Sequence, residues 1–196
     1  MNYSIYAEST PNPEVMKFVS NRMLADKSIE ISTVAEAHGI SIAEELLKFP
    51  FIKSIYLSSN FISITKEVEV EWGDIAMQLR TFIGDHLNSN EIKNYTENIN
   101  QKDKPVTKKN PKSYKSKNFN SQEEEVNELL NQYIKPAVEA DGGAITLNYY
   151  KNNVVCVDLK GACSGCPSST TTLKLGIETL LKEKIDPNIT VVANPS

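Results

Sequence analysis

The chain has 196 residues, of which 40% are hydrophobic, and a net charge of −4, so it can bury the core of one or two acidic domains. Its three cysteines are an odd number, which argues against a disulfide framework and indicates a reducing compartment. The first basic residue is Lys17, and no apolar run is long enough to span a membrane, so we expect no signal peptide, no mitochondrial transit segment, no membrane partner and a cytoplasmic location.

The charge is unevenly distributed along the chain. Residues 1–98 hold 8 Lys or Arg against 14 Asp or Glu, residues 99–121 hold 7 against 1, and residues 122–196 hold 6 against 10. The basic segment is rich in Lys, Asn, Ser and Pro, and its few apolar side chains cannot offset the entropy lost on ordering. We therefore predict two folded domains, residues 1–90 and 122–196, joined over residues 91–121 by a flexible basic linker that lets them move independently.

The seven lysines of this linker raise the question of nucleic-acid binding. The chain is acidic overall and carries no recognisable nucleic-acid-binding module, which argues against that partner. We expect the linker to contact the acidic domains transiently instead.

Alternating apolar residues predict the strands of the first domain, over residues 3–8, 16–19, 28–32, 52–57 and 61–65. Helical spacing predicts a helix that begins at Ser41, with Glu44 as its capping-box partner, and a closing helix over residues 72–88. The predicted fold of this half is a small α+β domain.

Two further features of this half have structural interpretations. The prolines of the segment Thr10-Pro11-Asn12-Pro13 fix φ and lack a donor, which favours a rigid turn over the alternative of a functional loop. Trp72 and Phe82 fall at helical spacing and are predicted to be core residues. The half contains no cysteine and no catalytic constellation.

The second half predicts the order α-β-β-α-β, so the fold class is α+β with two small domains. The elements are a helix from residue 121, a hairpin over residues 145–150 and 154–159, a helix over residues 170–185 and a strand over residues 189–193. Cys156 lies at the centre of a predicted strand, so we interpret it as a small packing residue and not as a ligand.

Between the hairpin and the following helix lies the segment 161–169 (GACSGCPSS), in which Cys163 and Cys166 form a C-x-x-C pair. The pair precedes a helix N-terminus, whose partial positive charge and unpaired N–H groups favour thiolates and the sulfides of a cluster. Gly161 and Gly165 lack a Cβ, which would let the backbone approach a bulky inorganic ligand.

A C-x-x-C pair alone is compatible with four interpretations: a dithiol oxidoreductase, half of a zinc site, half of an iron–sulfur site, or two unliganded loop thiols. Closed zinc sites and clusters take four ligands, and His38 and His86 lie far away in the sequence. The missing ligands would therefore come from a second copy of the chain. An oxidoreductase would place the pair in a βαβ context, whereas a hairpin precedes it here.

Longer motifs around the pair resemble a known family. The second half resembles the NifU C-terminal domain of Nfu-type iron–sulfur proteins over residues 122–196, through its segments 141–143 (DGG), 159–169 (LKGACSGCPSS) and 172–178 (TLKLGIE). The first half resembles the Nfu N-terminal domain over residues 3–88, through its segments 10–13 (TPNP), 16–18 (MKF), 51–53 (FIK) and 60–66 (NFISITK) and Trp72. The chain departs from the family at Ala144, where an acidic residue is frequent.

This resemblance implies an iron–sulfur cluster assembly protein that is a scaffold or carrier and not an enzyme. It implies that Cys163 and Cys166 of each of two chains bind one cluster, [4Fe–4S] in preference to [2Fe–2S], within a homodimer. The expected partners are an upstream cluster donor and the apo-proteins that accept the cluster. The alternative functions are a dithiol-disulfide oxidoreductase and a zinc-bridged structural dimer.

Overall fold

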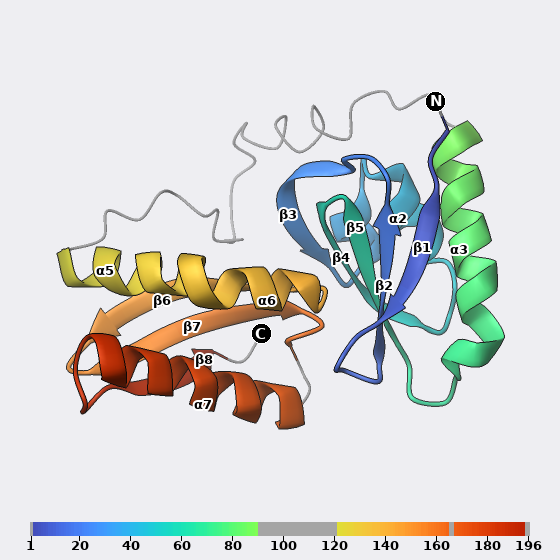
Figure 1. The fold of residues 1–196 in the computed structure, drawn as a ribbon. Helices are drawn as coiled ribbons and strands as arrows, with labels where there is room; N and C mark the ends of the chain where they lie inside the picture. The colour runs from blue at the N-terminus through green and yellow to red at the C-terminus, as the bar shows by residue number, and fades with distance from the viewer. Residues whose placement is uncertain (1, 90–120, 165–166, 195–196) are drawn as a thin grey trace.

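The computed structural model describes residues 2–89, 121–164 and 167–194, which form two α+β domains lying side by side (Figure 1). Each domain has its own sheet and its own hydrophobic core, and the two cores share no residue. The α+β fold class predicted from the sequence is confirmed. The predicted flexible linker falls mostly on residues 90–120, which lie outside the described residues.

The N-terminal sheet is antiparallel, with the strand order β1-β2-β5-β4-β3. Its strands are β1 (Ile5–Ser9), β2 (Val15–Ser20), β3 (Ala25–Ile31), β4 (Ile52–Ser59) and β5 (Phe61–Lys66), and its helices are α1 (Val34–Ala37), α2 (Ser41–Leu46) and α3 (Trp72–Ser89). Apolar side chains of the three helices pack with alternate residues of the strands into one core. Trp72 and Phe82 pack against this core, as predicted.

The capping box lies one helix earlier than the sequence suggested. Thr33 and Glu36 cap α1, which was not predicted, whereas α2 begins without a side-chain cap. The carboxylate of Glu44 instead accepts a hydrogen bond from the backbone N–H of Gly39 at 2.9 Å. The hydroxyl of Ser41 lies 2.9 Å from Nε2 of His86 on α3, so a tertiary contact uses the serine and a local one uses the glutamate of the expected box.

The C-terminal domain has the predicted order α-β-β-α-β. Its elements are α5 (Ser121–Leu129), a π-helical turn (Leu130–Ile134), α6 (Lys135–Ala140), β6 (Gly143–Lys151), β7 (Val154–Gly161), α7 (Pro167–Lys184) and β8 (Thr190–Asn194). β6 and β7 form an antiparallel hairpin, and β8 pairs parallel to β7 because α7 provides the crossover connection. The π-helical turn ends just before Pro136, which has no N–H to donate.

Helices α5, α6 and α7 form one layer that covers a single face of the sheet, with β6 and β7 behind it in Figure 1. Cys156 is not part of that core, although it is only 5% exposed, which agrees with a packing role. None of the helices within the described part of the chain is long and apolar enough to cross a membrane.

Candidate functional site

The strand β7 leads directly into the cysteine loop. Gly161 ends β7, and the backbone N–H and hydroxyl of Ser164 both donate to the Gly161 carbonyl, at 3.0 and 2.8 Å. Thr170, in the first turns of α7, donates from its hydroxyl to the Cys163 carbonyl at 3.4 Å. The loop that carries Cys163 is therefore held from both sides. Cys166, the other predicted ligand, lies outside the described residues.

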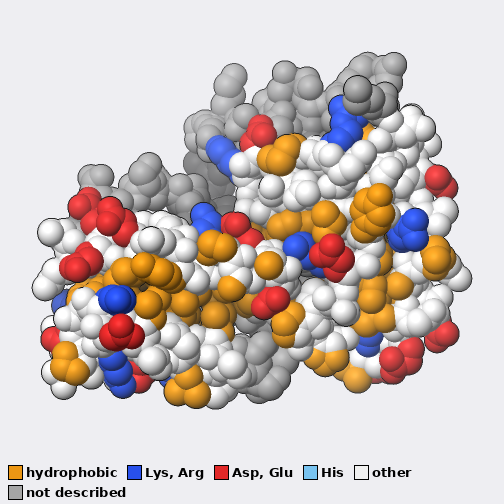
Figure 2. Space-filling view, in the orientation of Figure 1, with side chains coloured by type: hydrophobic (Ala, Val, Ile, Leu, Met, Phe, Trp, Pro, Cys, Tyr) orange, Lys and Arg blue, Asp and Glu red, His pale blue; other side chains and the backbone are white. Residues whose placement is uncertain are grey.

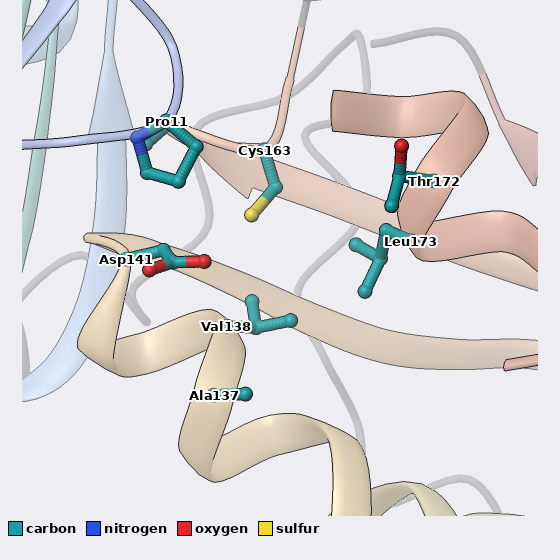
Figure 3. Close-up of a pocket in the computed structure, with 8 residues that line it drawn as sticks. Pro11, Ala137, Val138, Asp141, Cys163, Thr172 and Leu173 are labelled. Carbon is teal, nitrogen blue, oxygen red and sulfur yellow. The ribbon is translucent and has the colours of Figure 1, made fainter. Parts of the chain in front are cut away.

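Cys163 lines a cavity of about 390 Å³. The cavity is lined by Pro11, Ala137, Val138, Asp141, Ala162, Cys163, Thr172 and Leu173. Figure 3 shows the Cys163 sulfur directed toward Asp141 and Val138, between the end of α6 and the start of α7. The walls are mostly apolar and carry one carboxylate, from Asp141. Pro11 belongs to the N-terminal domain, so both domains contribute to the cavity.

The environment of Cys163 favours its protonated form. The residue is 7% exposed, and burial, with a smaller contribution from the negative charge of Asp141, raises the pKa of the Cys163 thiol to about 11. The expected preference for a thiolate at a helix N-terminus is therefore not met at Cys163. Iron would have to displace this proton, as metals do when thiolates bind them.

The raised pKa predicts slow alkylation of Cys163 in the ligand-free protein. Only the thiolate reacts with iodoacetamide, so the rate at Cys163 should rise about tenfold per pH unit until the pH approaches about 11. Asp141→Asn removes a negative charge that raises the pKa, so it should speed alkylation at pH 8, whereas Asp85→Asn on α3 should not. Mass spectrometry of the Cys163 peptide measures the rate, and a plateau already reached near pH 7 would contradict the assignment.

The N-terminal sheet presents a row of side chains to the C-terminal domain. Lys17, Ser63, Tyr56 and Glu30 are successive cross-strand neighbours on β2, β5, β4 and β3. Residues that flank them along the strands enter the helix-covered core, so the row lies on the opposite face of the sheet. We call these four residues the cross-strand row. Lys17, Ser63 and Tyr56 are at most 8% exposed.

Lys17 binds the end of helix α6. Its Nζ donates to the carbonyls of Glu139 at 3.1 Å and Ala140 at 2.9 Å, at the helix C-terminus, where a cation is favoured. The ammonium also lies 4.7 Å from the centre of the Phe61 ring and 3.9 Å from the carboxylate of Glu8. These contacts compensate the buried charge, since a buried ammonium is tolerated only with such partners.

The rest of the cross-strand row contacts two glycines. The Ser63 hydroxyl donates to the Gly142 carbonyl at 2.6 Å, and the Gly161 N–H donates to a Glu30 carboxylate oxygen at 3.4 Å. Both glycines have positive φ, of 80° and 61°. An added Cβ would lie 2.7 Å from the Ser63 hydroxyl at Gly142 and 2.9 Å from the Tyr56 ring at Gly161. The space expected to serve an inorganic ligand at Gly161 is therefore occupied by Tyr56.

Asn12 connects the proline-rich turn to the cysteine loop. Its Oδ1 accepts the Glu14 N–H at 3.0 Å, which closes the predicted turn. Its Nδ2 donates to the carbonyls of Ala162 at 3.2 Å and Ser164 at 3.5 Å, on either side of Cys163. The side chain is buried, with 3% exposed. The sequence suggested a rigid turn in preference to a functional loop here, and it gave no sign that Asn12 would bind the cysteine loop.

Comparisons with known proteins agree with the resemblance on both halves of the chain. The family model described as "Scaffold protein Nfu/NifU N terminal" matches residues 5–90, and the model described as "NifU-like domain" matches residues 126–192. A solved NifU-like protein from Saccharomyces cerevisiae is 25% identical and covers 46% of this chain and 82% of its own, with a TM-score of 0.39.

Curated relatives match most of the chain. A protein of Drosophila willistoni is 33% identical over 91% of this chain and 59% of its own length. A Homo sapiens protein is 29% identical over 91% of this chain and 66% of its own length. Both are named "NFU1 iron-sulfur cluster scaffold homolog, mitochondrial". The chain thus spans only about three fifths to two thirds of the length of these relatives.

The cytoplasmic location expected from the sequence is wrong in the light of these relatives, whose names point to mitochondria. That expectation depended on the charges of the first residues. Those residues do not decide the location, because the chain matches only part of each relative's length.

Proposed function

Because the chain belongs to the Nfu-type iron–sulfur scaffold proteins, with an Nfu/NifU N-terminal domain and a NifU-like domain, we propose that it binds an iron–sulfur cluster and passes it to apo-proteins. The observation that carries the proposal is the position of Cys163, whose thiol lines a largely apolar cavity at the point where β7 ends. An apolar wall excludes water from iron and sulfide.

Cys163 and Cys166 of each of two chains supply the four thiolates that a cluster takes. The surface near the cavity supports a paired arrangement. Figure 2 shows hydrophobic side chains gathered on the C-terminal domain over α5, α6 and α7. Tyr133 and Leu175, on this helical layer, are 51% and 60% exposed. A second copy of the chain would cover such a surface while it brings its own cysteine pair to the cluster.

The cluster is cargo in this proposal, [4Fe–4S] in preference to [2Fe–2S], received from an upstream donor and given to an acceptor protein. Transfer is an exchange of thiolate ligands at iron, so the protein needs no acid–base machinery and is not an enzyme. Within the described residues, no three His, Cys, Asp or Glu side chains gather closely enough to hold a metal ion.

Anaerobic reconstitution of the whole chain with iron and sulfide tests this function. We expect broad visible absorption from charge transfer between sulfur and iron, about four irons and four sulfides per two chains, and a shift to a dimer on size-exclusion chromatography. Zinc gives no visible band because its d shell is full, and a disulfide gives none either. A colourless zinc dimer, or a monomer with a reversible disulfide, would overturn the proposal in favour of the corresponding alternative.

A further inference from the structure

The N-terminal domain holds both backbone segments that meet at Cys163. Lys17 binds the C-terminal end of α6, Ser63 binds the turn between α6 and β6, and Glu30 contacts Gly161 at the end of β7. Asn12 binds the cysteine loop itself, through the carbonyls before and after Cys163. Every one of these contacts is made to the backbone of the C-terminal domain.

These contacts form the polar part of the interface between the two domains. Asn12, Lys17 and Ser63 are at most 8% exposed, and each donates to a carbonyl of the other domain. Leaving such buried donors unpaired is costly, which fixes the docked position. The two hydrophobic cores remain separate, so undocking would leave each core intact, while it would expose the polar groups of the interface and the Tyr56 ring that lies against Gly161.

We propose that Asn12 is a positioning residue for cluster binding, and that the N-terminal domain retains the cluster by holding the cysteine loop in place. The Asn12 amide binds the residues on both sides of Cys163 and thereby limits the directions in which its thiol can point. Pro11, from the same turn, lines the cavity. Release then requires this contact to loosen. The inference rests on the proposed function, because it assigns the held loop a role in keeping the cluster.

The test compares three variants of the full chain. Asn12→Asp keeps the oxygen that accepts the Glu14 N–H but loses the donor to the cysteine loop, whereas Asn12→Ala loses both. Asn88→Ala is the matched control, because the Asn88 amide bonds the backbone of Tyr3 within the N-terminal domain, at 2.7 and 3.1 Å. Circular dichroism establishes whether each variant is folded. If Asn12→Ala does not fold, Asn12→Asp still tests the inference, because it keeps the hydrogen bond that closes the turn.

The first measurement needs no cluster. Amide hydrogen exchange at Ala162 and Ser164 should rise about three- to tenfold in both Asn12 variants, as expected for loss of one hydrogen bond. It should stay at the wild-type rate in Asn88→Ala. The second measurement is the rate at which a chelator removes the cluster from loaded protein, and it should rise by a similar factor in the Asn12 variants alone.

Unchanged exchange in the Asn12 variants, or raised exchange without faster cluster loss, would overturn the inference. An equal effect of Asn88→Ala on either rate would also overturn it. Wild-type protein that takes up no cluster would overturn the proposed function instead. In that case, raised exchange confined to the Asn12 variants would still support Asn12 as the residue that positions the loop.

Discussion

Replacement of Cys163 by alanine should abolish cluster reconstitution, and so should replacement of Cys166, whereas Cys156→Ala should bind near-wild-type iron and sulfide. Cys163 lines the cavity at the end of β7, and the loss of one of two thiolates per chain leaves a cluster with too few ligands. Cys156 is buried and lies away from the cavity lining, so its removal costs packing and not ligation.

Iron and acid-labile sulfide per chain, measured after anaerobic reconstitution, give the comparison. Cys156→Ala is the matched control because it removes an equally buried thiol from the same strand-and-loop segment. If all three variants lose iron equally, the loss reflects damage to the fold and not removal of a ligand, and the assignment of the ligands is refuted.

Gly143→Ala should both destabilise the protein and reduce cluster binding. Gly143 begins β6 and pairs with Gly161, and an added Cβ would lie 2.7 Å from the Cys163 sulfur and 2.8 Å from the Lys160 carbonyl oxygen. The carbonyl belongs to the paired strand and cannot move aside without distorting the hairpin. We expect the free energy of unfolding to fall by about 1–3 kcal/mol, a typical cost of overpacking.

Gly176→Ala is the matched control for this substitution. Gly176 lies in α7, and apart from its own helix no described residue comes within 4 Å of a Cβ added there, so alanine should stabilise the helix by about 0.5–1 kcal/mol. Urea denaturation measures both variants, and reconstitution measures their iron content. A Gly143→Ala protein with wild-type stability and full iron content would contradict this prediction. It would show that the hairpin can accommodate the added methyl group and that cluster binding tolerates a shift of Cys163.

The local pattern of apolar residues in the sequence was sufficient to predict most of the strands and the longer helices. The alternation over β4 and β5, the helical spacing of α3 and the order of elements in the C-terminal domain all follow from periods of two and 3.6 residues. The same pattern, with the C-x-x-C pair, identified Cys163 as a candidate before any contact was known. Short elements were harder, and α1 was missed because four residues carry too little periodicity.

The docking of the two domains was decided only by tertiary structure. Lys17 and Ser63 follow the ordinary alternation of a sheet with one solvated face, and nothing local distinguishes a polar side chain that binds water from one that binds another domain's carbonyls. Asn12 lies 150 positions from the Ala162 carbonyl that it binds.

Contacts between distant parts of the chain also decided the chemistry of the site. The helix after the cysteine loop, a local feature, predicted a thiolate. The pKa of Cys163 is raised instead, because α6, β6 and the N-terminal turn bury the thiol beside Asp141. The sequence by itself thus determined the strands, the longer helices and the candidate cysteine. Only the tertiary structure decided what surrounds that cysteine, because burial depends on elements distant in the chain.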